Sequence, residues 1–489
     1  MSDVTRRKVL QILGAGAVGI GCGSSSDDAA PDAPPGAMGM TSPPATDSGT
    51  AGSGAPPADG VPPANEPTGL DMLQEIETIV VVMMENRSFD HFFGALARDA
   101  AYVNKATVTG TKGTETNPAP SGPAVKVYKA NTYTLASPPH GFDACHAQYD
   151  GGKNDNFVIE HAGANQNEVM AWYDRSQIPF YYWLADNFTI CDHWYASVLG
   201  PTWPNRFYLH ACTSAGKKDN TPITSGAPDT VWDRLKAAGK TAKNYHAGKS
   251  GFFSSAFPTK ISAGVNPMAK MDAFFADAKA GTLPAVSYID PDYSVSDDHP
   301  AHDIRLGQTF VASIYKALAA SPQWSKCLLV ITYDEHGGFW DHVPPPVAPD
   351  DDPEFKRFGF RVPAIVVGPT VKKGHLSTTQ YDHASVYATL AARFGLPALT
   401  TRSTKANTLS DVFDPARYKT PAPAPAIPPV IMMDAAALAT IGESSQPEIE
   451  EAVAAGLIPE DAVDLRPQDV RVGSWLREAE RLGALRILR

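Results

Sequence analysis

Two long apolar runs, each followed at once by acidic or amide side chains, form the strongest pattern in the chain. They read IETIVVVMM at residues 76–84 and CLLVITY at residues 327–333. A mostly apolar stretch of this length between polar residues predicts a strand buried on both faces of a parallel sheet. Shorter runs predict two more strands, at 283–289 and 362–368. Because helical patterns separate these strands, the sequence indicates the α/β class.

Helical periodicity occupies the intervals between the strands. From Gln308 onward, apolar residues recur at the spacing that places them on one face of a helix. A second helix is predicted over 229–239, with Asp229 as its N-cap, and a third over 382–395, where Gly395 ends it.

The composition changes on both sides of this α/β region, which we place at residues 70–405. Residues 23–69 are rich in Ser, Gly, Pro, Ala and Asp and contain no aromatic residue, so they predict a disordered tether. Residues 104–138 are rich in Thr, Pro and Gly and predict an inserted loop over the sheet. Residues 406–489 form a Pro-rich and partly helical C-terminal extension, to which the sequence assigns no function.

The first residues, 1–22, have the composition of an export signal. Arg6 and Arg7 precede a short apolar stretch that ends at Cys22, and this arrangement resembles a twin-arginine signal with a lipoprotein cysteine. Gly19 stands where lipoprotein sites usually carry Leu, so a plain signal peptide cut elsewhere is the alternative. We expect an exported protein: a periplasmic or cell-surface lipoprotein held at the membrane surface, or a secreted protein.

The charge balance limits the classes of partner. The chain carries 53 acidic and 41 basic residues, for a net charge of −12. This balance argues against a nucleic-acid binder, which usually presents a basic face. The negative net charge does not exclude an anionic substrate, because a bound cation makes the local electrostatic field positive. No obligate protein partner is inferred.

Four cysteines follow the predicted export signal, and their spacing bears on whether they could bind zinc. None has CxxC spacing, which argues against a zinc-thiolate site. An exported chain permits disulfides, and four cysteines allow three connectivities. Cys327 opens a predicted core strand and is expected to be a buried thiol.

Oxygen ligands for a metal ion are predicted at the ends of the two long strands. Glu85 and Asn86 follow the first run, and Asp334 and Glu335 follow the second. Ligands bind beyond the carboxyl ends of the strands in open α/β sheets, so these side chains are expected at one point. Such a set favours a hard divalent ion, with calcium preferred over zinc. The alternative is that the acids cap helices or pair with arginines.

A hydroxyl stands on the turn GPTWPNR, at Thr202. Gly200, Pro201 and Pro204 force an irregular loop, and a helix begins near Asn205. A hydroxyl on such a turn can be presented to a substrate as a nucleophile, and coordination to a metal would make its alkoxide accessible near neutral pH. The alternative is a helix-capping threonine without chemistry.

Histidines gather in polar loops that contain proline. Cleavage of a phosphate ester needs charge stabilisation and a proton for the leaving oxygen, and imidazole can supply both. The alternative is structural hydrogen bonding. The histidines of these loops are His140, His299, His302, His336 and His342.

Five motifs in a fixed order carry a resemblance to a known family. They read ENRSFDHFFG, GPTWPNR, DDHPAHDIRLGQ, ITYDEHGGFWDHVPPP and GFRVPAIVVGP, and the resemblance covers residues 72–400. This pattern resembles the phosphoesterase family of bacterial phosphatidylcholine-hydrolysing phospholipases C, plant non-specific phospholipases C and a bacterial acid phosphatase. The stretch 299–346 is most similar to the plant enzymes. The resemblance implies an alkaline-phosphatase-like, three-layer α/β/α sandwich with a mostly parallel central sheet.

The resemblance also implies roles for individual residues. The family's metal ligands match Glu85, Asn86, Thr202, Asp334 and Glu335. Thr202 matches the nucleophile as well.

Three histidines match positions that contact the phosphoryl group in the family: His299, then His140 with a looser motif, and His246 in NYHAG with the loosest. We therefore expect a metal-dependent phospholipase C that releases diacylglycerol through a phosphothreonine intermediate. A broad-specificity acid phosphatase and a non-catalytic surface binding protein are the alternatives. The residues after 405 do not resemble the large C-terminal domain of some bacterial phospholipases C, which argues against a membrane-damaging role.

Overall fold

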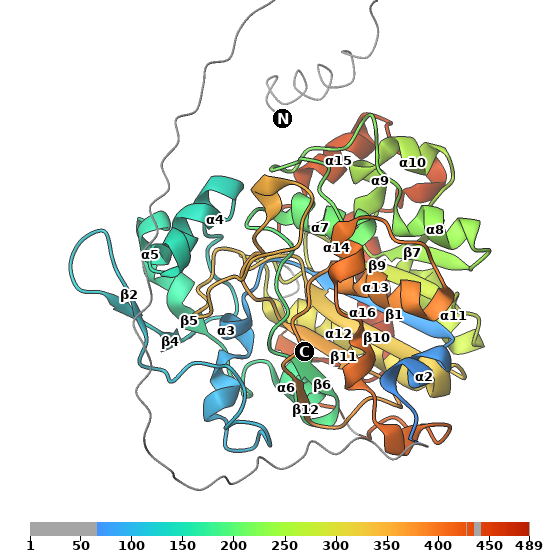
Figure 1. Cartoon of the computed structure of the whole chain (residues 1–489), viewed down its shortest axis with the longest axis horizontal. Coiled ribbons are helices and arrows are strands. Elements are labelled where there is room, and N and C mark those ends of the chain that lie inside the picture. Colours follow the sequence, from blue (N-terminus) through green and yellow to red (C-terminus); the bar gives the residue numbers. More distant parts are fainter. Residues whose placement is uncertain (1–65, 427, 435–441, 489) are drawn as a thin grey trace, which may run out of the picture. The chain divides into compact units, whose positions relative to one another are not determined.

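An eight-stranded sheet runs through the centre of the part that the computed structural model describes, residues 66–426, 428–434 and 442–488 (Figure 1). The predicted export signal with Cys22, and the tether as far as residue 65, lie outside these described residues. The chain from Pro67 onward forms one compact unit. In spatial order the strands are β12 (His375–Ser377), β6 (Thr189–Cys191), β11 (Ala364–Val367), β10 (Cys327–Tyr333), β1 (Thr78–Met84), β9 (Val286–Asp290), β7 (Ala242–His246) and β8 (Met268–Lys270).

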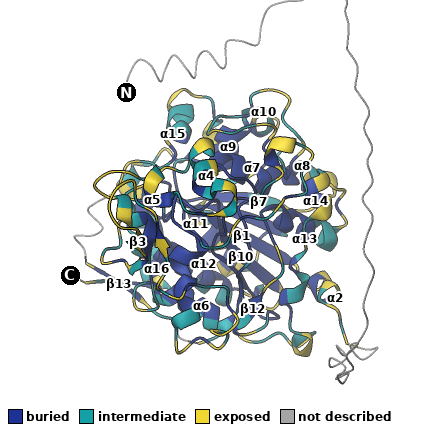
Figure 2. Ribbon diagram, turned by 60° about the vertical axis from the view of Figure 1, so that its left-hand side comes forward, coloured by how far each residue is buried: buried dark blue, intermediate teal, exposed yellow. Residues whose placement is uncertain are grey.

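The two long predicted strands lie side by side at the middle of the sheet. β1 and β10 pair in parallel from Thr78 opposite Cys327 to Met84 opposite Tyr333, and every residue of both strands is buried. Figure 2 shows this buried centre in dark blue. Each residue of β1 lies opposite the corresponding residue of β10, so both strands end at the same level. The residues that follow the two strands therefore enter the same space.

The sheet is mostly parallel, as the sequence predicts. β11 is the exception, since it pairs antiparallel with both β10 and β6. The runs at 76–84, 283–289 and 362–368 predict the right strands with ends that differ by a few residues. β6, β7, β8 and β12 are missing from the prediction, because they are short and, in the case of Ala242–His246, contain polar residues.

Helices cover both faces of the sheet, which gives the three layers of the predicted sandwich (Figure 2). One group is built around α12 (Ile304–Ala319), which packs on α6 (Pro179–Asn187), α11 (Met271–Ala280) and α16 (Gln468–Arg481). The other is built around α13 (Ala384–Phe394), which packs on α2 (Gly69–Gln74), α7 (Thr202–Ala211) and α14 (Thr401–Lys405). The short helices α8 (Val231–Ala237), α9 (Phe252–Ala256) and α10 (Pro258–Ser262) continue along the chain from α7.

Several predicted helix starts differ from the structure. α7 begins at Thr202, before the predicted start near Asn205. The N-cap of α8 is Thr230 and not Asp229: the Thr230 side chain accepts from the backbone N–H of Asp233, whose carboxylate accepts from Thr230 in return. This reciprocal capping box satisfies two backbone donors, whereas Asp229 forms an ion pair with Arg234. α12 begins at Ile304, one turn before the predicted Gln308.

The segment predicted as a loop, 104–138, carries short strands. They are β2 (Thr116–Asn117), β3 (Val125–Lys126) and β4 (Tyr128–Lys129), the last of which pairs with β5 (Ala171–Trp172). Figure 1 shows β2 and β4 beside α4 (Phe142–Tyr149) and α5 (Phe157–Glu160), in a lobe at the left of the view. The same lobe contains α3 (Phe89–Phe92), which follows the first acidic motif.

The C-terminal extension packs on the unit that contains the sheet. Its strands β13 (Ile431–Asp434) and β14 (Leu485–Leu488) pair in parallel, and α15 (Pro447–Ala454) and α16 lie between them in sequence. Trp475 of α16 contacts Phe310 of α12 with ring centroids 5.6 Å apart. None of the helices in the described ranges is both long and apolar enough to cross a membrane.

The cysteines of the described residues are all buried and unpaired. They are Cys145, Cys191, Cys212 and Cys327. Burial raises the pKa of each thiol, to about 12 for Cys327. The prediction of a buried Cys327 thiol is confirmed, and no disulfide forms among these four residues.

Candidate active site

The two acidic motifs meet at the carboxyl ends of β1 and β10. The backbone N–H of Asn86 donates to Oδ1 of Asp334 at 2.9 Å, and the N–H of Glu335 donates to the same oxygen at 2.7 Å. Asn86 has a φ of +60°, a left-handed conformation that asparagine tolerates better than most residues. Gly337, at a φ of +65°, allows the loops to approach, because a Cβ there would lie 2.2 Å from the carbonyl oxygen of Asn86.

The hydroxyl of Thr202 lies against this junction. Thr202 is the first residue of α7 and is only 1% exposed, and its Oγ1 donates to Oδ1 of Asn86 at 3.4 Å. The neighbouring Pro201 is in an extended conformation and makes no side-chain capping contact. Thr202 directly follows the N-cap position of α7, and its hydroxyl bonds to Asn86 at the strand ends instead of capping the helix.

A buried arginine that the sequence analysis overlooks completes the junction. The Nε of Arg206 donates to Oε1 of Glu85 at 3.1 Å, and its guanidinium lies 3.7 Å from carboxylate oxygens of Asp334 and Asp290. It also donates to the carbonyl oxygens at the end of β1. Arg206 follows Thr202 by one helical turn, so the i, i+4 relation in GPTWPNR could have revealed it.

Burial raises the pKa of three carboxyl groups at this point. Burial and the neighbouring Asp334 raise the pKa of Glu85 well above its ordinary value, against the opposing effect of Arg206. Burial raises the pKa of Asp334 too, although Arg206, backbone N–H groups and the Thr202 hydroxyl oppose the rise. Burial raises the pKa of Glu335 to about 8. One guanidinium does not balance three buried carboxylates, so a further positive charge would stabilise the site.

Unsatisfied oxygen atoms show that the site fits a cation. Oδ2 of Asp334 and Oε1 of Glu335 are buried without a hydrogen-bond partner in the described structure. Buried acceptors without partners are costly unless a donor or a metal ion completes them. The amide oxygen of Asn86 and the hydroxyl of Thr202 adjoin them, so the donor set consists of oxygen atoms, as hard divalent ions prefer.

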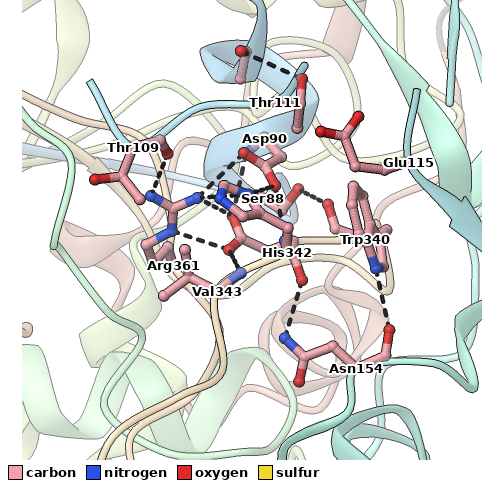
Figure 3. A network of polar contacts seen from close by, with 12 residues as sticks. Ser88, Asp90, Thr109, Thr111, Glu115, Asn154, Trp340, His342, Val343 and Arg361 are labelled. Atoms are coloured by element: carbon pink, nitrogen blue, oxygen red, sulfur yellow. Dashed lines mark hydrogen bonds and ion pairs between the residues drawn. The ribbon is translucent and has the colours of Figure 1, made fainter. Parts of the chain in front are cut away.

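A second acidic cluster lies nearby, around Arg361 (Figure 3). Within the described ranges, Asp90, Asp341 and His342 form the one group of carboxylate and imidazole donors that all lie within 4.8 Å and could hold a metal ion. Arg361 already donates to Asp341 at 2.9 Å and to Asp90 at 3.1 Å, and Nδ1 of His342 donates to Asp90 at 2.6 Å. Arg361 and His342 compensate these charges through direct hydrogen bonds, whereas Asp334 and Glu335 each keep one oxygen without a hydrogen-bond partner in the described structure.

Three histidines follow one another in a row of ring contacts that begins beside Asn86. Nδ1 of His140 donates to the carbonyl of Pro138 at 2.7 Å, which leaves Nε2 to accept from the Asn86 amide at 3.2 Å. The ring centroids of His140 and His299 are 5.9 Å apart, and those of His299 and His302 are 6.1 Å apart. Burial lowers the pKa of His299 to about 3, so this ring is neutral.

His302 has the opposite protonation. Its Nδ1 donates to Asp297 at 2.6 Å and its Nε2 donates to the carbonyl oxygen of Glu443 at 3.0 Å. Because neither acceptor can donate, both ring nitrogens carry hydrogen and the imidazole is charged. Burial works against this charge, but Asp297 outweighs it and raises the pKa of His302 to about 8.

His246 stands apart from the other predicted histidines. It ends β7, and its Nδ1 donates to the carbonyl of Gly248 at 2.9 Å. No hydrogen bond or ring contact among the described residues joins it to Thr202, His140 or His299. Its role as a phosphoryl contact stays a prediction.

A comparison with protein families identifies the family of this chain. The model of the phosphoesterase family matches residues 76–397, which contain all the predicted ligands, Thr202 and the three histidines. The chain belongs to the phosphoesterase family. Membership makes it a phosphoric ester hydrolase, as the sequence predicts.

Relatives of this phosphoesterase include plant and bacterial phospholipases C. Non-specific phospholipase C1 of Arabidopsis thaliana is 34% identical over 382 residues, which are 69% of this chain and 71% of the relative. Phospholipase C B of Mycobacterium tuberculosis is 29% identical over 414 residues, which are 71% of this chain and 79% of the relative.

The solved structures that match this phosphoesterase are distant from it in sequence. One is a protein in the alkaline phosphatase superfamily from Vibrio parahaemolyticus, with 12% identity and a TM-score of 0.32, covering 70% of this chain and 78% of that one. Another is the phosphonate monoester hydrolase of Agrobacterium radiobacter, with 8% identity and a TM-score of 0.31, covering 69% and 77%.

Proposed function

We propose that this phosphoesterase is an exported, metal-dependent phospholipase C that cleaves glycerophospholipids to diacylglycerol and a phosphorylated head group. The observation that carries the proposal is the position of Thr202, whose buried hydroxyl lies 3.4 Å from Oδ1 of Asn86 beside the unsatisfied oxygens of Asp334 and Glu335. The relatives are named phospholipases C, which supports a diester substrate over a monoester.

The metal ion would be held by oxygen atoms of the strand ends and of the nucleophile's helix. Calcium suits such a set better than zinc. When bound, a divalent ion supplies charge stabilisation to the reacting phosphoryl group and favours ionisation of a nearby hydroxyl. The proposed ligands are Glu85, Asn86, Thr202, Asp334 and Glu335.

Thr202 would act as the nucleophile. The Thr202 hydroxyl gives up its proton as its Oγ attacks phosphorus in line. The bond from phosphorus to the glycerol oxygen breaks, that oxygen takes up one proton, and diacylglycerol leaves with no net change in protons. Water then attacks the phosphothreonine, Thr202 recovers its hydroxyl, and the phosphorylated head group departs. Phosphoryl transfer of this kind depends mainly on positioning and on stabilisation of the equatorial oxygens.

The histidines would stabilise the phosphoryl oxygens. His299 is neutral, and the described residues give its ring no hydrogen-bond partner, so a ring N–H can donate to a phosphoryl or leaving oxygen. His140 is held by Pro138 and Asn86 on the adjacent side. His246 would complete the set if a substrate reached the end of β7.

A substrate panel tests the proposal against its alternatives. Purified enzyme, loaded with calcium, magnesium, manganese or zinc, is offered phosphatidylcholine and other glycerophospholipids alongside phosphomonoesters. Release of diacylglycerol, with mass-spectrometric detection of phosphate on Thr202, supports the phospholipase C. Turnover of monoesters alone supports the acid phosphatase, and binding without turnover supports a surface binding protein.

Export and anchoring form a separate part of the proposal. The support is sequence-based: Arg6, Arg7 and Cys22 in the signal pattern, followed by the tether at 23–69. Such a tether would let a lipid-anchored enzyme reach esters at the membrane surface. Periplasmic, cell-surface and secreted forms are distinguished by cell fractionation.

A further inference from the structure

Part of the C-terminal extension enters the candidate site, although it lies outside the family match at 76–397. We propose that Gln446 is a positioning residue for the metal ligand Glu85, and that the extension is therefore a component of the active site. This inference rests on the proposed function, because it concerns the same metal ion. It gives a role to residues 443–446, to which the sequence assigned none.

The side chain of Gln446 bridges Glu85 and the helix of the nucleophile. Its Nε2 donates to Oε2 of Glu85 at 2.9 Å, and its Oε1 accepts from the indole Nε1 of Trp203 at 2.6 Å. Gln446 is 1% exposed. An indole N–H can only donate and a carboxylate oxygen can only accept, so the two partners leave the amide one orientation.

This contact suits a residue that orients a metal ligand. The other oxygen of Glu85 accepts from Arg206 at 3.1 Å, so each carboxylate oxygen has one protein donor and keeps a lone pair for an ion. Glutamine is neutral, so it holds Glu85 without adding charge that would compete with a cation. Residues that orient metal ligands in this way typically contribute 10- to 100-fold to metal affinity.

Neighbouring residues of the same segment fix Gln446 in place. The N–H of Ser445 donates to the carbonyl of Tyr293 at 2.6 Å, and its hydroxyl donates to Asp297 at 2.7 Å. The carbonyl of Glu443 accepts from His302 at 3.0 Å. The segment therefore contacts the metal side of the site through Gln446 and the histidine side through Asp297.

A second contact holds the extension to the same loop. Gln468, the first residue of α16, donates to Oγ of Ser294 at 2.7 Å. Ser294 lies in the loop between β9 and α12 that also carries His299. Gln468 touches neither Glu85 nor Trp203, so it provides a matched control: the same residue type, in the same extension, without the contact that the proposal invokes.

Calorimetric titration of the full-length protein with calcium chloride tests the inference. The wild type is compared with Gln446→Met, which keeps the length of the side chain and removes both hydrogen bonds. It is also compared with Gln446→Asn, which keeps the amide and is one methylene too short to span both partners. Gln468→Met is the control. We expect the Kd for calcium to rise about 10- to 100-fold in Gln446→Met, less in Gln446→Asn, and not in Gln468→Met.

Each outcome decides a different point. Calcium binding by both Gln446 variants with the wild-type Kd would overturn the inference and leave the proposed function intact. A wild type that binds no calcium, and no magnesium, manganese or zinc when the chloride of each is titrated in its place, would overturn the metal site itself. If neither Gln446 variant folds, as judged by circular dichroism, Gln446 is a folding residue and the positioning role is wrong. An equal loss in Gln468→Met would assign the effect to docking of the extension.

Discussion

The backbone N–H of Asn86 donates a hydrogen bond of 2.9 Å to Oδ1 of Asp334, a residue 248 positions further along the chain. Together with the backbone N–H of Asp334, which donates to the carbonyl oxygen of Met84 at 3.1 Å, this bond joins the ends of β1 and β10 and holds the two acidic motifs side by side. It also orients Asp334, since one oxygen is engaged by backbone N–H groups and the other is left without a partner. The candidate metal site follows from that arrangement.

Replacing Thr202 by alanine should abolish turnover and leave the fold intact. The loss of a covalent nucleophile should lower kcat by several orders of magnitude, by analogy with roughly 10⁶ for a serine-hydrolase nucleophile. The assay is diacylglycerol release from phosphatidylcholine, with the thermal unfolding midpoint as the control for folding. Retention of more than about a tenth of the wild-type rate would mean that water attacks the phosphorus directly.

Glu85→Gln and Asp334→Asn should each lower metal content and activity together. Both changes remove a charged oxygen ligand at the ends of neighbouring strands, and loss of a bound ion also removes its contribution to the stability of the native state. Elemental analysis of the purified variants, together with thermal unfolding at several calcium concentrations, measures both effects. Full metal occupancy in both variants would show that these acids are structural.

His299→Ala should slow cleavage without loss of the metal ion. An acid–base contribution is typically about 10²- to 10⁴-fold in rate. A nitrophenyl phosphoester has a good leaving group, so its cleavage should be affected less than that of a phospholipid if His299 protonates the leaving oxygen. Equal losses on both substrates would show that His299 stabilises charge instead.

The ion pair between His302 and Asp297 should make stability depend on pH. Asp297 raises the pKa of His302 from 6.5 to about 8, so its stabilisation is fully present below pH 6.5 and is lost as the pH rises through about 8. His302→Gln should therefore lower the unfolding free energy by about 2 kcal/mol more at pH 6 than at pH 9. Urea unfolding of wild type and variant at both pH values measures the difference. If His302→Gln lowers the unfolding free energy by the same amount at pH 6 and at pH 9, His302 is not charged in the folded protein.

Cys22→Ser should release active enzyme from the membrane fraction into the soluble fraction. One acyl chain binds a membrane weakly, so a stable anchor needs the several chains of a lipoprotein. Fractionation of cells that express wild type and variant measures the distribution. Wild-type protein found only in the soluble fraction would remove the anchor from the proposal and leave the catalytic assignment unaffected.

The centre of the fold was predictable because its signal is local. The strands β1 and β10 are mostly apolar runs, the pattern typical of a parallel strand that is buried on both faces. The residues that follow such strands must meet at one edge, so Glu85, Asn86, Asp334 and Glu335 could be placed together before any coordinates were known. The antiparallel direction of β11 was not predictable, since a short apolar run has no direction.

Other parts of the site have weaker signals or none. Arg206 was predictable in principle from its helical spacing to Thr202. Gln446 was not, because its contact with Glu85 joins residues 361 positions apart and depends on one neutral side chain in a polar segment. The pairing of His302 with Asp297 likewise depends on how the loop after β9 folds, which no periodicity encodes.

The unpaired cysteines have a consequence for how the protein can be made. Their side chains are at most 1% exposed, so oxidants and metal ions reach them poorly, and none of the four links distant parts of the chain. Folding of the described unit therefore requires no oxidising compartment. A reducing buffer is compatible with the described fold, so it is suitable for the measurements above.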